Sequence, residues 1–242
     1  MSGQINDLFG KPISVINVGL ASMAEAVQAQ NLPVLDVDWR PPLDGVPVLR
    51  FTASGVNMDT ANAETCQRIK QGRPVLVGMG IARDLLGMHP HLILHAGPPV
   101  TWERMCGPQR GAVIGALIYE GLAQDEAQAA ELAASGAIEF SPCHHHHSVG
   151  PMAGVVSPSM PLFILENKTY GNRAYCTQNE GLGKVLRYGG LGPEVYTRLK
   201  WMETDLYPAL DRALQTLPDG IDIRSLIAQA MHMGDECHNR NR

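Results

Sequence analysis

Neither an excess of positive charge nor a long apolar run is present in this 242-residue sequence. Its 19 Lys and Arg residues are outnumbered by 24 Asp and Glu residues, so a net charge of −5 gives no general attraction for a polyanion such as nucleic acid. No stretch reaches the roughly 18 apolar residues that a membrane-spanning helix needs, and residues 1–7 do not begin a signal peptide. The sequence predicts a cytoplasmic protein with no nucleic-acid or membrane partner.

Three familiar motifs are also missing. The five cysteines are an odd number at irregular spacing with no C-x-x-C pair, so no disulfide framework is expected. The sequence contains neither the G-x-G-x-x-G dinucleotide fingerprint nor the G-x-x-x-x-G-K-[ST] phosphate loop. We therefore expect reduced thiols and no organic cofactor.

Charged residues are scarce at 18%, while hydrophobic residues make up 45%, which predicts a large buried core. The first 45 residues have the pattern strand, helix, strand, at residues 13–20, 23–30 and 34–39. Further strands and helices alternate from residue 60 onward. These patterns predict an α/β fold, with a small N-terminal βαβ-like lobe (residues 1–45) leading into a larger mixed α/β domain (residues 46–242).

A run of four histidines occupies residues 144–147. If the strand expected at residues 139–143 continues, His144 and His146 face one side and His145 and His147 the other. Thiolate, imidazole and carboxylate ligands suit zinc. The alternative is a polar loop whose imidazoles hydrogen-bond the glycine-rich turn that follows.

A second polar cluster lies near residue 240. On a helix, His232 and Glu236 are four residues apart and share one face. They predict either the other half of a zinc site made by His144, His146, His232 and Glu236, or a carboxylate that orients an imidazole for acid or base work, with His238 close by. A polar helix face paired with its own neighbours is the third interpretation.

Between these clusters, residues 179–187 are typical of a glycine turn that opens a helix. Free backbone N–H groups at a helix start, with Lys184 and Arg187 three apart on one face, predict an anion site. The candidate phosphate-binding residues are Asn179, Gly181, Gly183, Lys184 and Arg187, with Arg173 as an alternative cation. A solvated turn would give the same pattern.

Several segments together resemble one known family. They are residues 141–145, 149–154, 157–161, 166–167, 171–176, 179–185 and 233–236, with His238 and Asn239. The sequence resembles the YlbE-like family, also called AllG, a subunit family of oxamate carbamoyltransferase. Residues 17–20 and 38–42 also look like the front of that family, so the resemblance covers nearly the whole chain.

The resemblance implies a role in purine or allantoin catabolism, in which oxalurate and phosphate become oxamate and carbamoyl phosphate. It also implies an acyl-CoA-synthetase-like partner subunit and a further small subunit. Members of the family continue well past the segment at residues 234–241, so a complementary C-terminal half or subunit is expected. On this interpretation the chain is a fragment, a processed half or one piece of a split protein, and has little activity alone.

A mechanism for carbamoyl transfer follows on chemical grounds. Negative charge that builds on the carbamoyl oxygen needs a donor, for which His144 or His145 is the candidate. Lys184 and Arg187 would neutralise phosphate, and Glu236 with His238 would manage the proton on the leaving nitrogen. Two other functions stay open: a metal-dependent amidohydrolase-type enzyme, and a non-catalytic subunit that scaffolds a partner's active site.

Overall fold

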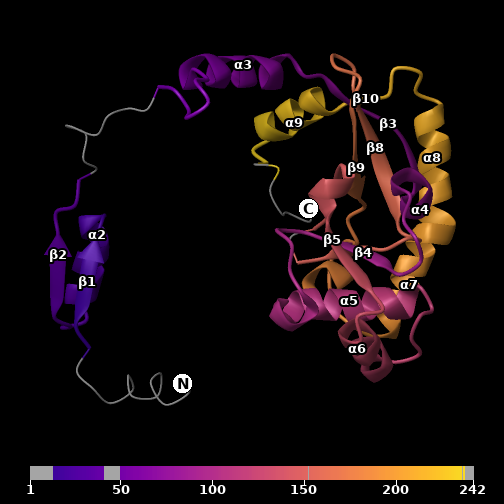
Figure 1. Ribbon diagram of the computed structural model, residues 1–242, viewed down its shortest axis with the longest axis horizontal. Coiled ribbons are helices and arrows are strands. Elements are labelled where there is room, and N and C mark those ends of the chain that lie inside the picture. Colours follow the sequence, from indigo (N-terminus) through magenta and orange to yellow (C-terminus); the bar gives the residue numbers. More distant parts are fainter. Residues whose placement is uncertain (1–12, 41–49, 152, 236, 238–242) are drawn as a thin grey trace. The chain divides into compact units, whose positions relative to one another are not determined.

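The protein is an α/β protein, as predicted, in a computed structural model that describes residues 13–40, 50–151, 153–235 and 237 (Figure 1). Its internal contacts divide the chain into two units, Met1–Glu64 and Thr65–Arg242. The division falls inside helix α3 (Met58–Gln71). The boundary expected near residue 46 lies within residues 41–49, outside the described residues.

The first unit contains the predicted strand–helix–strand pattern. Strand β1 (Val15–Val18) and strand β2 (Val34–Val37) pair in parallel through the crossover helix α2 (Ala21–Gln28). The side-chain amide of Asn17 donates a 2.6 Å hydrogen bond to the carboxylate of Asp36 on the neighbouring strand. This side-chain hydrogen bond adds to the backbone hydrogen bonds that hold the two strands in register.

The second unit contains a five-stranded sheet in the order β10, β3, β8, β9, β6. Strands β3 (Pro74–Ile81), β8 (Pro161–Asn167) and β9 (Arg173–Thr177) are antiparallel neighbours, whereas β6 (Ser148–Val149) runs parallel to β9. The remaining edge strand is β10 (Ile221–Asp222), and it leads into helix α9 (Ile223–His232).

A three-stranded sheet in the order β5, β4, β7 forms the rest of the second unit's strand structure within the described residues. Strand β4 (Leu92–His95) is buried throughout and lies between β5 (Glu139–Pro142), which is parallel to it, and the short antiparallel β7 (Val155–Val156). Because successive strand residues face opposite sides, Ile93 enters one core cluster and Leu94 the other.

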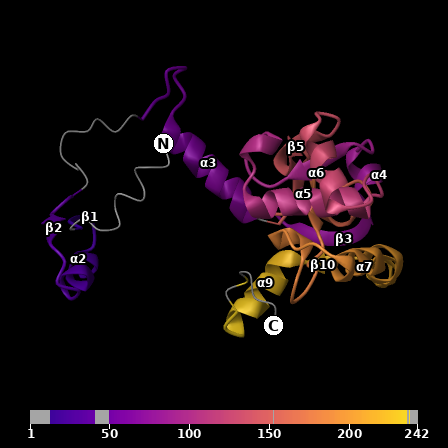
Figure 2. The same cartoon turned by 90° about the horizontal axis from the view of Figure 1, so that it is seen from below.

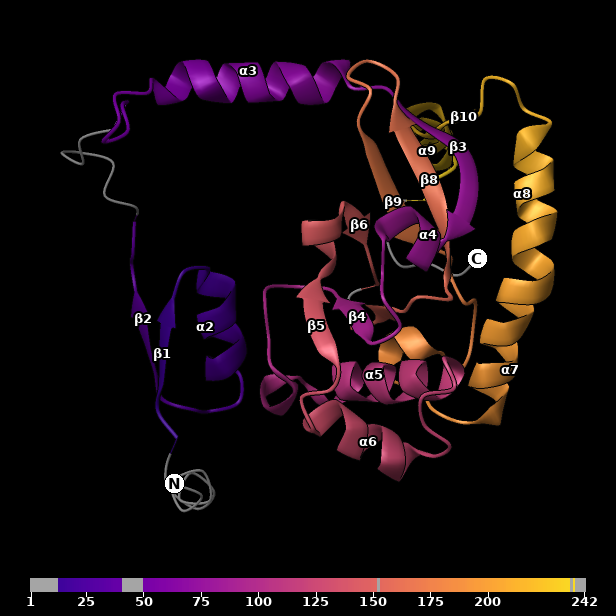
Figure 3. The same ribbon diagram turned by 45° about the vertical axis from the view of Figure 1, so that its right-hand side comes forward.

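Helices cover these sheets on their outer sides. The crossover from β4 to β5 runs through α5 (Gly107–Tyr119) and α6 (Glu126–Ala134), which lie together beside the two strands (Figures 1 and 2). Helix α7 (Pro193–Trp201) continues through a π-helical turn (Met202–Leu206) into α8 (Tyr207–Gln215), which runs along β3 (Figure 3). A short helix, α4 (Ala82–Leu86), follows β3 directly.

None of the helices within the described ranges has the length and apolar character required to cross a lipid bilayer.

Glycines allow α5 to lie directly against the loop that follows β9. A Cβ atom added to Gly111 would come within 2.6 Å of the carbonyl oxygen of Gly189, and one added to Gly115 would overlap the Leu186 side chain. The backbone of Gly189 has φ of 77° and itself approaches the carbonyl oxygen of Pro108. Helix α5 therefore fixes the position of the 3-10 turn Leu186–Tyr188.

Candidate functional site

The carboxyl ends of the parallel strands β6 and β9 form one wall of a cleft of about 570 Å³. Adjacent carboxyl ends of parallel strands are the usual position for ligands in α/β proteins, because the loops leave the sheet there in the same direction. The residues that line the cleft are Val149, Gly150, Pro151, Cys176, Thr177, Gln178, Asn179, Arg187, Tyr188 and Cys237.

Arg187 supplies the charge of this cleft. Its side chain is only 6% exposed, and no carboxylate is among the described lining residues. The guanidinium donates to the side-chain carbonyl of Asn179 and to the backbone carbonyl of Gly181, and it lies over the Tyr188 ring at 5.0 Å from the centroid. A buried cation attracts an anion more strongly than a cation in water does.

The loop that presents Arg187 is built around the carboxylate of Glu180. Its two oxygens accept the backbone N–H groups of Leu186 and Arg187 at 2.6 and 2.9 Å, which fixes the start of the 3-10 turn. Gly181 has φ of 84°, and its N–H donates to the Asn179 side chain at 2.8 Å. Asn179 thus holds the glycine turn and the arginine together.

Gln178 adds a buried amide to the same cleft. It is 8% exposed; its NH₂ group lies 3.7 Å from the sulfur of Met79, and its side-chain oxygen has no hydrogen-bond partner within the described part of the chain. An unpaired buried acceptor costs about 1–3 kcal/mol. Sequence reasoning missed Gln178 although it directly precedes Asn179, because a lone glutamine carries no motif.

The predicted helix at residues 179–187 is wrong. The turn is present, but only Leu186–Tyr188 is helical, as a single 3-10 turn, and α7 does not begin until Pro193. Gly189 at φ 77° and Gly192 at φ 126° leave the right-handed helical region, so the turn cannot be extended.

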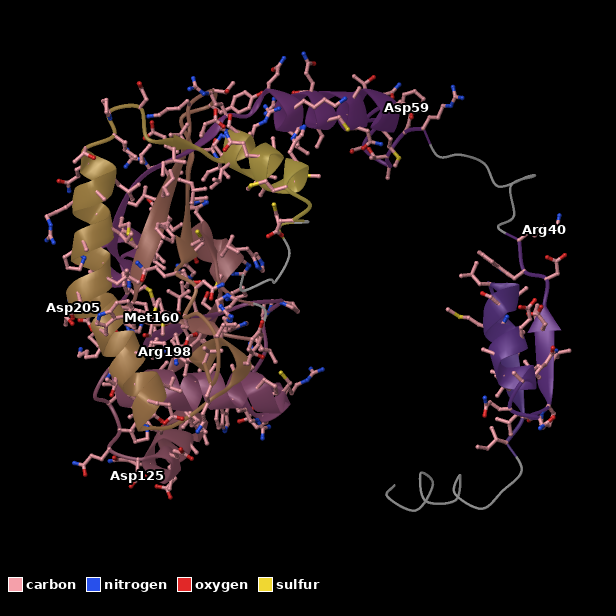
Figure 4. All side chains as sticks on the ribbon, turned by 180° about the vertical axis from the view of Figure 1, so that it is seen from behind. Arg40, Asp59, Asp125, Met160, Arg198 and Asp205 are labelled. Atoms are coloured by element: carbon pink, nitrogen blue, oxygen red, sulfur yellow. The ribbon has the colours of Figure 1, made fainter. Side chains whose placement is uncertain are left out.

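The three candidate cations therefore lie apart. Lys184 pairs with Glu194 of α7 at 3.2 Å and does not line the cleft, and its carbonyl accepts from Arg198, labelled on α7 in Figure 4. Arg173 lies at the opposite end of β9 from Thr177, where Glu166 binds it at 2.9 Å. Gly183, at φ 90°, shapes the turn but does not line the cleft either. Of the predicted anion-binding residues, the structure brings Asn179, Gly181 and Arg187 together.

The strand-like alternation predicted for the histidine run is also wrong. Cys143–His146 form a 3-10 turn, and His147 follows in the left-handed region at φ 53°. The rings of His144 and His145 meet edge to face at 4.6 Å, and both side chains are exposed; His146 is within 2.9 Å of the Ser141 hydroxyl. This turn precedes β6, whereas the cleft follows it, so His144 and His145 do not line the cleft.

The C-terminal candidates are divided by the end of α9. The helix ends at His232, whose Nδ1 is 2.8 Å from the carbonyl of Ala228. Glu236 and His238 lie outside the described residues, so their proposed roles stay predictions. Among the described residues, no group of three or more His, Cys, Asp or Glu side chains is placed to hold a metal ion.

The two half-buried or buried thiols near the cleft should react slowly. Burial raises the pKa of Cys143 and of Cys176, which keeps both in the unreactive thiol form near neutral pH. We expect iodoacetamide to label the exposed Cys66, Cys106 and Cys237 first, as followed by peptide mass spectrometry over time. Labelling of Cys176 as fast as that of Cys66 would contradict the burial of this side of the cleft.

Comparison with known proteins supports a relationship over the cleft-bearing region. The sequence profile of the family described as "Oxamate carbamoyltransferase subunit AllG" matches residues 138–242, a range that contains every residue lining the cleft. The chain is 46% identical over 183 residues to the Escherichia coli protein "Oxamate carbamoyltransferase subunit AllG", covering 75% of this chain and 44% of that protein.

Two further relatives have no assigned function. The Escherichia coli "Uncharacterized protein YahG" is 49% identical over 242 residues, which is 97% of this chain and 51% of that protein. A crystal structure of a conserved protein of unknown function from Enterococcus faecalis V583 superposes with a TM-score of 0.74 at 53% identity, covering 76% of this chain and 44% of that one.

The fold and the cleft define an α/β protein with a buried arginine in the wall of a cleft. The chain belongs to the AllG family, as its sequence motifs had indicated. It spans about half the length of the curated relatives that it matches.

Proposed function

We propose that the cleft beside Arg187 binds the anionic end of a small carbamoyl substrate, and that the chain contributes this site to an oxamate carbamoyltransferase. The reaction would convert oxalurate and phosphate into oxamate and carbamoyl phosphate. The observation that carries the proposal is the buried Arg187, whose positive charge lies in the wall of the cleft. Each of the four compounds carries a carboxylate or a phosphate for that cation to bind.

Acid and base groups for the reaction would come from outside the described cleft. Its described lining residues include no histidine, aspartate or glutamate, and burial keeps the Cys176 thiol protonated. Glu236 and His238 are the candidates in this chain, because Cys237, between them in sequence, lines the cleft. His144 and His145, the donors expected for the carbamoyl oxygen, do not line the cleft.

A shared active site is the second candidate function, and the composition of the cleft favours it. A subunit can bind and orient a substrate while a partner polypeptide supplies the proton-transfer groups. The polypeptide represented in the other half of the relatives' length is the first such partner we propose, and an acyl-CoA-synthetase-like subunit is the second. Nothing among the described residues favours the zinc amidohydrolase hypothesis.

Activity should therefore depend on the partner. We expect residues 1–242 alone to bind carbamoyl phosphate or oxamate in calorimetry, but to turn over oxalurate and phosphate at least about 100-fold more slowly than the assembled complex, the loss typical of a missing general acid or base. Full turnover by residues 1–242 alone would contradict the shared site. Absence of any anion binding to the folded chain would contradict the proposed cleft.

A further inference from the structure

The first unit has an apolar sheet face that no described element of that unit covers. In the parallel register of β1 and β2, Ile16 pairs with Leu35 and Val18 with Val37. Ile16 and Leu35 are 67% and 62% exposed, and Val18 and Val37 are exposed as well. Four aliphatic side chains thus form one continuous patch, which we call the outer face.

The opposite face of the same two strands is the one that the lobe itself covers. Residues of the alternating set, Val15 and Asn17 on β1 and Val34 on β2, point away from the outer face, as the two-residue period of a strand requires. Helix α2 packs on the two strands (Figure 3). Its Ala24 is the one residue of the helix that is buried.

A parallel pair of this kind is an incomplete sheet. All-parallel sheets occur almost only with both faces covered, because their crossover connections place helices on each side. Two strands alone are marginal in water, and a hydrophobic sheet face needs a third strand or a packed helix. The described part of the lobe supplies one helix and two strands, so a cover for the outer face and a further strand come from outside this described part.

We propose that the outer face of β1 and β2 is a docking surface for the polypeptide that makes up the other half of the relatives' length. This polypeptide extends the parallel sheet and covers the four aliphatic side chains. The relatives support this occupant, because this chain accounts for only 51% and 44% of their lengths. The patch is aliphatic and uncharged, as expected for a permanent contact rather than a transient polar one.

The inference rests on the proposal that the chain works with such a polypeptide, but not on the chemistry of the cleft. Arg187 belongs to the second unit and the outer face to the first, so each can be altered separately. Anion binding and polypeptide docking are therefore independent measurements on the same variants.

The test uses residues 1–242 together with the part of Escherichia coli YahG that this chain does not match, expressed as a separate polypeptide. Association is measured by native mass spectrometry and by titration, and the exposure of β1 and β2 by amide hydrogen exchange. The disruptive variant is Ile16→Lys with Leu35→Lys, two positions whose side chains are exposed in the lobe. The matched control is Gln28→Lys with Gln30→Lys, which adds lysines to exposed positions of the same lobe.

We expect a complex with the unaltered chain and with the control, and slower amide exchange in β1 and β2 once it forms. The Ile16→Lys, Leu35→Lys variant should bind at least about tenfold more weakly. The reason is that burial of one large aliphatic side chain raises the binding affinity by about this factor. The proposal would be overturned if both variants bound with equal affinity or if no complex formed at all. It would also be overturned if these amides were protected before the second polypeptide is added, or if residues 1–242 formed a dimer that the lysines abolish. If the chain docks but does not bind phosphate, this result would contradict the proposed anion site in the cleft and leave the docking proposal unaffected.

Discussion

Replacing Arg187 with glutamine is expected to weaken binding of inorganic phosphate and of carbamoyl phosphate by about 10- to 150-fold, as measured by titration calorimetry. A hydrogen bond to a charged group contributes about 1.5–3 kcal/mol, and each 1.36 kcal/mol is a factor of ten in affinity. Arg187 is buried and lines the cleft, so water screens its charge little.

Two matched controls separate the cleft from the general charge of the loop. Lys184→Gln and Arg173→Gln remove the same charge from residues that are more than half exposed and that pair with Glu194 and Glu166. Both variants should bind phosphate within about twofold of the unaltered protein, since exposed ion pairs contribute about 0–1 kcal/mol. The sequence pattern had predicted that Lys184 binds phosphate too. An equal loss of phosphate affinity at Lys184 and Arg187 would therefore support the anion site predicted from the sequence and contradict the cleft seen in the structure.

Protein stability has to be followed in the same variants. Arg187 also anchors its loop through Asn179 and Gly181, so Arg187→Gln should lower the melting temperature somewhat. Asn179→Ala loosens the same anchor without removing the charge, and we expect it to retain part of the affinity. If Asn179→Ala and Arg187→Gln weaken phosphate binding equally and lower the melting temperature equally, anion binding depends on the order of the loop rather than on the arginine charge.

The second large effect is expected at Gly111, where α5 meets the Arg187 loop. Gly111→Ala would place a methyl group 2.6 Å from the carbonyl oxygen of Gly189, a backbone atom that cannot turn aside. Overpacking of this kind lowers the free energy of unfolding by about 1–3 kcal/mol, and each kcal/mol lowers the melting temperature by about 2–4 °C in a domain of 150–250 residues. Phosphate affinity should fall in parallel, because Gly189 is two residues from Arg187.

Gly107→Ala on the same helix is the control. A Cβ atom at Gly107 meets nothing within 4 Å, and its φ is not in the left-handed region. Alanine also favours a helix more than glycine does. We therefore expect unchanged or slightly higher stability and unchanged anion binding. A fall in stability equal to that of Gly111→Ala would indicate a general effect on α5 rather than the contact with Gly189.

Local patterns predicted much of the fold. Strand β4 at Leu92–His95 and the β1–α2–β2 crossover follow from short apolar runs and helical spacing, whose physical causes lie within a few residues. The histidine turn and the Arg187 loop were predicted less well. Both depend on backbone conformations, at His147 and Gly189, that the neighbouring sequence permits but does not require.

The motifs of residues 138–242 were sufficient by themselves to determine the family, and the spacing of apolar residues determined the α/β class. Only the tertiary structure decided which residues form the cleft. Ser148 and Val149 pair with Tyr175 and Cys176, so the cleft joins segments 27 residues apart, through a strand pairing that no local pattern encodes. The glycine turns at Gly183 and Gly189 leave Arg187 in the lining of the cleft and Lys184 outside it, because side chains close in sequence need not share a surface once such turns redirect the chain.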